Sequence, residues 1–310
     1  MNSTTSQISG TLPASLNNDT EQTMSRDINE TKFSFKAFRN LKKGLGEFDA
    51  VVECNEMAIR EFLKNLKASQ NQKQFIQDLS QKHGVRVDTV SVDLFSSRIR
   101  LFYILSVMQQ AEQFIDEFRK EYKTYNPTWA EKVDGETDFD NLLRNIFFSK
   151  GQGIIEIGDE VYHGFEYYRF VRNRFAHSEE KDVKKLENLR LKISNYSSFY
   201  NSKFHLVDSP NNYDKIDFND FLLFTNIIKH IGYTLCEKCK PDNSQLADKI
   251  SKLEFRVENK TINPLKNIFK LKNHPDRFSN AIGNLLNSTF GKINKTDRDE
   301  IIQHINRILA

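Results

Sequence analysis

Four polar side chains that could act on a phosphodiester lie close together in the chain: Arg169, Arg172, Asn173 and His177. An arginine is permanently charged and can bind a phosphate through two parallel hydrogen bonds. A histidine titrates near neutral pH and can therefore move a proton during a reaction. An asparagine can orient either group or donate a hydrogen bond to a phosphate oxygen. Together, these residue types suit phosphate chemistry.

RNA is a substrate for which such a site needs few catalytic groups, because the RNA's own 2′-hydroxyl can serve as the nucleophile. A protein has only to deprotonate that hydroxyl, stabilise the pentavalent phosphate and protonate the leaving 5′-oxygen. These steps require no metal ion and no cofactor. We therefore expect a metal-independent reaction on single-stranded or loop RNA, whose backbone can rotate into line. His177 is the expected general base or acid, Arg172 the expected phosphate ligand, and Asn173 the residue that orients them.

These side chains can meet only if residues 164–178 form a helix. At about 100° per residue, Tyr168, Val171 and Phe175 fall on one side of that helix and are expected to enter the core. The four polar side chains fall on the opposite side, with the small Ala176 among them. A small residue at that place leaves room for another surface to approach the polar side.

The run Arg-Asn-Arg-Phe-Ala-His at residues 172–177 matches the R-N-x-x-x-H motif of HEPN domains, so the chain resembles that ribonuclease family over about residues 94–240. The resemblance implies a helical bundle that dimerises, with motifs of two copies forming one composite cleft. It implies Arg172, Asn173 and His177 as catalytic residues, and cleavage that leaves a 2′,3′-cyclic phosphate. Many similar proteins are toxins or act in phage defence, so we also expect an antitoxin or sensor partner.

Three further residues are candidates for RNA binding. Arg169 and Glu166 are included from the helix geometry alone, and His163 because it lies just before the motif helix, where it could reach the mouth of a cleft. Each could equally be an ordinary surface residue. Lysines and arginines spread over residues 260–295 could follow an RNA backbone or simply form a solvated face.

Two other interpretations of the motif remain open. The first is a HEPN-like dimer that has lost catalysis and acts as a scaffold or binding module. The second is a helical partner-binding regulator in which the motif is coincidental. In that case Arg172 would pair with Glu179 or Glu180 on a solvated face, and His177 would only complement the helix dipole.

The composition favours helices, because Gly and Pro number only 12 and 6 in 310 residues. We expect an all-α fold: an antiparallel HEPN-like helical bundle with additional N- and C-terminal helices. The bundle helices are predicted at 94–122, 138–148, 164–178 and 218–238, with a charged helix at 182–200 and a linker at 151–153. Shorter helices are predicted at 56–67 and 72–81, and a brief strand-like patch at 85–92. The predicted division is a polar tail (1–30), an N-terminal helical extension (31–93), the bundle (94–240) and about three short helices (241–310).

The sequence also indicates the cellular environment in which the chain is expected. It has no apolar run long enough to cross a membrane and no secretory signal, so we expect a cytoplasmic protein with no membrane partner. Cys236 and Cys239 have zinc-type spacing, but no second such pair exists, and we expect them and Cys54 to be free thiols. The net charge of +3 is too small to indicate nucleic-acid binding by itself.

Overall fold

The computed structural model of the chain describes residues 33–87, 92–177, 183–206, 210–257 and 260–309, with all their side chains except those of residues 92–94, 177, 257, 260 and 309. Thirteen helices and one antiparallel pair of short strands make up the regular structure of this part of the chain. The fold is therefore all-α, as the sequence predicts. The elements are α1 (Lys36–Ala68), α2 (Gln72–His83), α3 (Val92–Lys123), α4 (Asp138–Phe147), α5 (Lys150–Ile157), α6 (Asp159–His177), α7 (Val183–Ser194), α8 (Ser197–Phe204), α9 (Phe218–Lys238), α10 (Asn243–Ser251), β1 (Phe255–Val257), β2 (Lys260–Ile262), α11 (Pro264–Phe269), α12 (Pro275–Phe290) and α13 (Lys295–Leu309).

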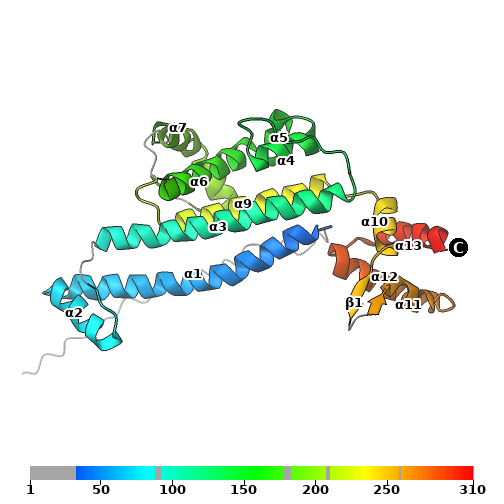
Figure 1. The fold of residues 1–310 in the computed structure, drawn as a ribbon, viewed down its shortest axis with the longest axis horizontal. Coiled ribbons are helices and arrows are strands. Elements are labelled where there is room, and N and C mark those ends of the chain that lie inside the picture. Colours follow the sequence, from blue (N-terminus) through cyan, green and yellow to red (C-terminus); the bar gives the residue numbers. More distant parts are fainter. Residues whose placement is uncertain (1–32, 88–91, 178–182, 207–209, 258–259, 310) are drawn as a thin grey trace, which may run out of the picture. The chain divides into compact units, whose positions relative to one another are not determined.

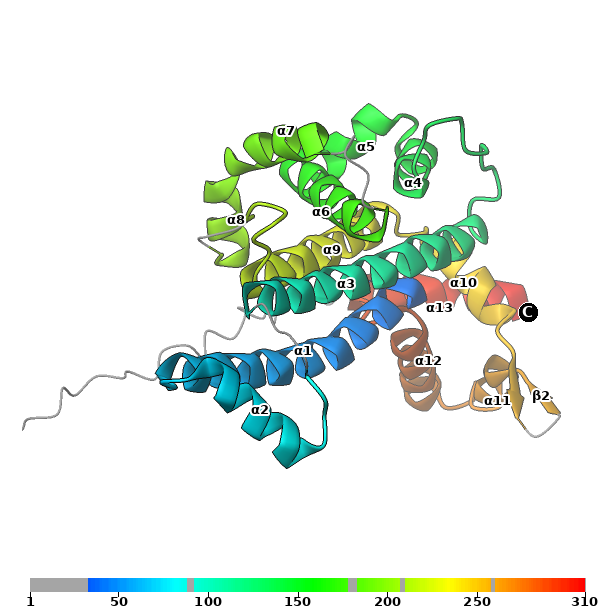
Figure 2. The same cartoon turned by 60° about the vertical axis from the view of Figure 1, so that its left-hand side comes forward.

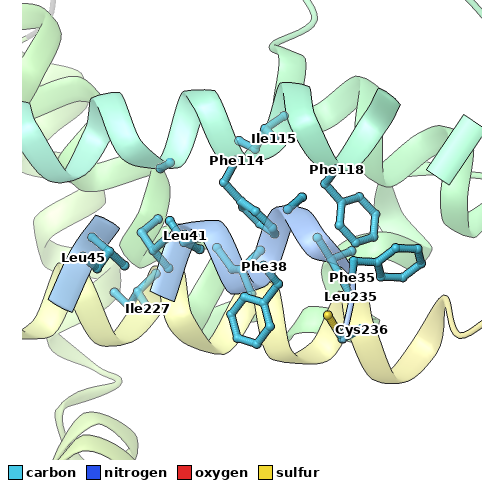
Figure 3. Close-up of a cluster of buried hydrophobic side chains, with 14 of the residues drawn as sticks. Phe35, Phe38, Leu41, Leu45, Phe114, Ile115, Phe118, Ile227, Leu235 and Cys236 are labelled. Atoms are coloured by element: carbon cyan, nitrogen blue, oxygen red, sulfur yellow. The ribbon is translucent and has the colours of Figure 1, made fainter. Parts of the chain in front are cut away.

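Three long helices, α1, α3 and α9, pack against one another and enclose much of the hydrophobic core (Figure 1). Figure 3 shows where they meet: Phe35 and Phe38 at the start of α1 contact Phe114 and Phe118 of α3, with Leu235 of α9 beside them. The ring centroids of Phe35 and Phe118 are 4.7 Å apart. All five side chains are buried. Burial of side chains of this size contributes roughly 1.5–3 kcal/mol each.

The motif helix α6 lies against α3 and α9 (Figure 2), and its aromatic side supplies the contacts. The Phe165 ring packs on Phe139 of α4 with centroids 4.6 Å apart, and the Tyr168 ring on Phe224 of α9 at 4.8 Å. Val171 is buried on the same side. These contacts fix the rotation of α6, so its polar side must face away from α9.

The buried carboxylate of Asp220 joins the start of α9 to the middle of α6. The Tyr168 hydroxyl donates to Oδ1 at 2.8 Å, and the backbone N–H of Asn211 donates to the same oxygen at 2.9 Å. The Asn211 side-chain amide and the backbone N–H of Asp217 donate to Oδ2, each at 2.9 Å. The Asp217 side chain in turn accepts from the Asp220 N–H, which completes a capping box at the start of α9. The segment before α9 is thereby fixed to the motif helix.

Several predicted helices are confirmed. The helix predicted at 218–238 is α9, that at 138–148 is α4, and that at 94–122 is α3, each within two residues at either end. The motif helix is longer than predicted, because it begins at Asp159, where Asp159 and Glu160 complement the positive end of the helix dipole. The single charged helix predicted at 182–200 is instead two helices, α7 and α8, with a turn at residues 195–196 between them.

The prediction of a linker at 151–153 is wrong, since that stretch lies within α5. The Ser149 side chain caps this helix by accepting from the Gln152 N–H at 3.1 Å. Gly153 lies against α4 so closely that a Cβ there would be 2.6 Å from Leu143 Cβ. Its lack of a side chain serves close helix packing rather than a loop. The strand-like patch predicted at 85–92 is no strand where described: residues 85–87 are irregular and Val92 begins α3, while residues 88–91 lie outside the described parts.

The N-terminal helix α1 is fixed to α3 by a buried ion-pair cluster as well as by apolar contacts. Glu56 of α1 accepts hydrogen bonds from Arg100 of α3, the shorter at 2.8 Å, and from Arg60 one turn away at 2.9 Å. Burial acts to raise the pKa of Glu56, but the hydrogen bonds and the positive charges of the two arginines together lower it. The carboxylate therefore stays charged in the folded chain.

We expect Glu56→Ala to lower the free energy of unfolding by about 3 kcal/mol, because it leaves the largely buried Arg100 without its partner. The folded pKa of Glu56 is depressed, so its contribution is present above its unfolded pKa and is lost as pH falls through the folded value. Urea unfolding at neutral and acid pH measures both effects. Glu61→Ala on the same helix is the matched control, since Glu61 makes only exposed contacts to Lys64 and Asn65. Equal losses in the two variants would contradict the prediction.

The C-terminal segment, predicted as about three short helices, has four helices and the small hairpin among its described residues. It joins the start of α1 through backbone and ring contacts. The Ser34 N–H donates to the Phe290 carbonyl at 2.7 Å, and the rings of Phe33 and Phe290 lie 5.9 Å apart. None of the described helices has the length and apolarity needed to cross a membrane.

Candidate active site

A cleft of about 420 Å³ lies between α3, the start of α4 and the polar side of α6. We call it the motif cleft, because Arg172 and Asn173 line it together with Arg169. Met108, Ile115, Phe139 and Phe165 supply apolar lining. The cleft thus combines an apolar floor with the polar residues of the motif.

Arg172 is held in this cleft by two polar contacts. Its Nη1 donates to the Asn173 side-chain oxygen at 3.1 Å, and its Nη2 forms an ion pair with Glu112 of α3. The Arg172 side chain is 24% exposed, so it is neither in the packed interior nor fully solvated. In the structure its charge is balanced by a carboxylate that is itself 53% exposed and could be displaced by an anion.

The rest of the cleft carries charges of both signs. Arg119 pairs with Asp116 on α3, and Lys132 pairs with Asp138 at 3.2 Å. A hydrogen bond from Lys120, and a weaker effect of Arg119, hold the pKa of Asp116 below its usual range. The cleft is therefore not a strongly basic surface, and any anion specificity must come from the position of its arginines.

Arg169 and Glu166 form a two-bond ion pair, with Nε donating to Oε1 at 2.8 Å and Nη2 to Oε2 at 2.7 Å. The Arg169 guanidinium also lies 4.4 Å from the Phe170 ring centroid. Burial acts to lower the pKa of Arg169, but the hydrogen bonds to Glu166 and the negative charges of Glu166 and Asp140 together raise it. Arg169 lines the motif cleft, whereas Glu166 is buried and faces a different cavity. The two hydrogen bonds to Glu166 fix the orientation of the Arg169 guanidinium in the structure.

His163 is not in the motif cleft. It lines a separate cavity of about 480 Å³ between α5, α6 and α7. Its Nδ1 contacts the Asp159 carbonyl oxygen at 2.7 Å, and its Nε2 lies 2.8 Å from Lys192 Nζ. The structure therefore brings together Arg169, Arg172 and Asn173, and separates His163 from them.

His177 is the last residue of α6, and its side chain lies outside the described side chains. The helix is unbroken from Asp159 to His177. A residue four positions after Asn173 lies about 40° away around the axis, so the two occupy the same side of α6. Glu179 and Glu180, which the surface interpretation pairs with Arg172, lie outside the described residues.

Sequence reasoning missed the second wall of the cleft. Glu112, Asp116 and Arg119 lie on the polar side of α3, where their charges resemble those of any solvated helix face. Only the packing of α3 on α6 selects Glu112 as the partner of Arg172, some 60 residues away in sequence. A pairing over such a separation has no local signal.

The two closely spaced cysteines are buried thiols. Burial raises the pKa of both Cys236 and Cys239 to about 12, so neither forms a thiolate at neutral pH. Cys54 is exposed. No group of three or more metal-ligating side chains occurs among the residues that the structure describes. Comparison of the chain with protein-family models, with curated proteins and with solved structures found no match.

Proposed function

We propose that the chain is a metal-independent endoribonuclease of the HEPN type that cuts single-stranded RNA at a site shared by two copies. The observation that supports this most is the placement of Arg172 and Asn173 side by side in one accessible cleft, joined by a hydrogen bond of 3.1 Å. The helix that bears them continues to His177 on the Asn173 side. These three residues form the motif on which the resemblance rests.

In the proposed reaction, His177 of one copy removes the proton of the 2′-hydroxyl as the O2′–P bond forms. Arg172 binds the scissile phosphate and stabilises the charge that develops on its oxygens. Asn173 orients the arginine and the phosphate. The P–O5′ bond then breaks, and His177 of the second copy gives a proton to the leaving oxygen. The products are a 2′,3′-cyclic phosphate and a free 5′-hydroxyl.

The test of this function is cleavage of a labelled single-stranded RNA by the purified chain in the presence of EDTA. We expect undiminished cutting and fragments that end in a 2′,3′-cyclic phosphate, because each proton and charge in the proposed reaction is handled by a side chain. Product ends are identified by mass spectrometry. Loss of cutting in EDTA, restored by added divalent ions, would count against the proposal.

In this reaction Glu112 competes with the substrate phosphate for Arg172. We expect Glu112→Gln to tighten RNA binding about threefold to tenfold, because the guanidinium is no longer held by an opposing carboxylate. Fluorescence anisotropy on the His177→Ala background measures binding without cleavage. Glu117→Gln is the matched control: it changes the net charge equally on the same helix, where Glu117 contacts Asn40 and Gln113 instead. Equal effects of the two substitutions would show that only net charge matters.

The same ion pair favours the second candidate, a HEPN-like scaffold without catalysis. If Glu112 holds Arg172 permanently, the arginine serves packing and the cleft does no chemistry. That candidate predicts a dimer that neither cuts RNA nor arrests growth when expressed. The toxin or anti-phage role predicted from the sequence requires the opposite result, growth arrest that His177→Ala relieves.

A further inference from the structure

A second pocket, of about 310 Å³, borders the C-terminal part of α6. We call it the aromatic pocket. It is built from three elements: α3, α6 and the segment before α9. The residues that matter for its chemistry are Arg98, Arg174, Phe175, Tyr213 and Asp214.

Arginines and aromatic rings alternate in this pocket. The Arg98 guanidinium lies 5.2 Å from the Phe175 ring centroid, and that of Arg174 lies 4.9 Å from the Tyr213 ring centroid. Phe102 packs edge-on against Phe175 at 5.5 Å and is 54% exposed. Phe175 itself is only half-buried, although the sequence places it on the core side of α6. Partly exposed rings with guanidinium planes beside them are surfaces on which unpaired nucleic-acid bases stack.

The pocket lies next to the proposed catalytic residues along the chain. Phe175 lies three residues after Arg172, and Arg174 three residues before His177, so each pair is separated by only about 60° around the axis of α6 and the pocket adjoins the polar side of the helix. A strand whose phosphate is bound by Arg172 would therefore have a neighbouring nucleotide within reach of these rings. Capture of an adjacent base would also hold the strand in register for cleavage.

Asp214 gives the pocket a means of discrimination. Its carboxylate is exposed and lines the pocket, and no described side chain forms a hydrogen bond or ion pair with it. A carboxylate only accepts hydrogen bonds, so it selects a base edge that donates them. Guanine presents two parallel donors, N1–H and N2–H, on its Watson–Crick edge, and this edge is free only in unpaired RNA. Cytosine offers one such group, its 4-amino group, whereas uracil offers a single imino N–H flanked by two carbonyl oxygens that a carboxylate repels.

We propose that the aromatic pocket binds one unpaired base of the RNA substrate, with guanine preferred. The base stacks on the rings of Phe175 and Tyr213, the two arginines lie over the strand, and Asp214 accepts from the Watson–Crick edge. The inference rests on the proposed function for the identity of the ligand. It adds a base preference that the catalytic motif does not supply.

Binding of short fluorescent uridine oligonucleotides carrying one central G, C, A or U tests this assignment. The protein is the full chain with His177→Ala, so that no RNA is cut. We expect the G oligonucleotide to bind about tenfold more tightly than the all-U one. Tyr213→Leu should weaken binding of the G oligonucleotide about tenfold through loss of stacking. Asp214→Asn should remove the preference for G, so that the G and all-U oligonucleotides bind about equally.

Phe148→Leu is the matched control for loss of an exposed ring, since Phe148 is 96% exposed and belongs to neither site. Phe175→Leu, which removes the other stacking ring, is a second variant in case Tyr213→Leu impairs folding, and it should likewise weaken binding of the G oligonucleotide about tenfold. Equal binding of all four oligonucleotides, or no effect of Asp214→Asn, would overturn the pocket assignment. Cleavage by the unmodified chain without base preference would contradict the pocket assignment but not the proposed nuclease function. A preference for G in binding without any cleavage would support the pocket assignment and contradict the proposed nuclease function.

Discussion

Replacement of His177 by alanine is expected to reduce RNA cleavage by at least about a thousandfold. A positioned general acid or base contributes roughly 10²–10⁴ to a rate, and in a shared site the substitution removes both the base of one copy and the acid of the other. We expect folding to be retained, because His177 ends α6 and the buried side chains described in that helix belong to residues before it. Initial rates on a fluorogenic single-stranded RNA, with circular dichroism as the folding check, measure the effect.

His83→Ala controls for the loss of a histidine, since His83 is exposed at the end of α2 and should leave the rate unchanged. Arg172→Lys adds a graded test. The lysine keeps the positive charge but lacks the two-donor fork that binds a phosphate bidentately, so we expect a smaller loss of rate than in His177→Ala. Cutting by His177→Ala at the wild-type rate would show that the motif takes no part in the reaction.

The polar side of α6 could be predicted from sequence, because helical periodicity alone places Arg169, Arg172 and Asn173 together. The residues on the opposite wall of the motif cleft could not be predicted from sequence. Glu112 pairs with Arg172 only through the packing of α3 on α6, and Asp214 lines the same pocket as Arg174 and Phe175 because the Asp220 network fixes the segment before α9. Local sequence indicates which residues share one side of a helix, but not which other element packs against that side.

In the fold, too, some elements could be predicted from local sequence and others could not. Helices α3, α4 and α9 were predictable because each has a sustained apolar period. The segment that forms α5 was not, because its glycines weaken any helical signal. Only the tertiary structure shows that Gly153 is required for contact with Leu143 of α4. The start of α6 was missed for a related reason, since Gly164 weakens the helical signal there, although the buried Val161 continues the apolar side of the helix before it.

Asp220→Ala is expected to lower the free energy of unfolding by about 3–5 kcal/mol. The substitution leaves four donors, from Tyr168, Asp217 and both the backbone and side chain of Asn211, without their acceptor in a buried site. It also removes part of the capping box of α9. Urea denaturation followed by circular dichroism measures the loss.

The cost of this substitution should depend on pH. Burial raises the pKa of Asp220 to about 6, against a lower value in the unfolded chain, so the folded state keeps its proton at a pH where the unfolded state loses it. The stabilising contribution of Asp220 is therefore fully present below the unfolded pKa and declines as pH rises towards about 6. We expect Asp220→Ala to cost more at about pH 4.5 than at about pH 7.

Asp248→Ala is the control for Asp220→Ala, because Asp248 is exposed and pairs only with Lys252 on the surface of α10. A loss below about 0.5 kcal/mol is expected there. Asp220→Asn keeps the volume but turns an amide N–H₂ towards N–H donors, so it should also destabilise the chain. If Asp220→Ala were as stable as the wild type, the network would not be what fixes the segment before α9.

The claim on which the account depends is that two copies of α6 face each other at His177. The distance between spin labels on Ala176→Cys, an exposed position beside His177, tests it most directly. The Cys54→Ser background removes the exposed native thiol, and Cys236 and Cys239 are buried. The account predicts one short, narrow distance between the labels of two copies, which vanishes when labelled chain is diluted with unlabelled chain. A monomer, or a dimer whose labels are too far apart to couple, would contradict it.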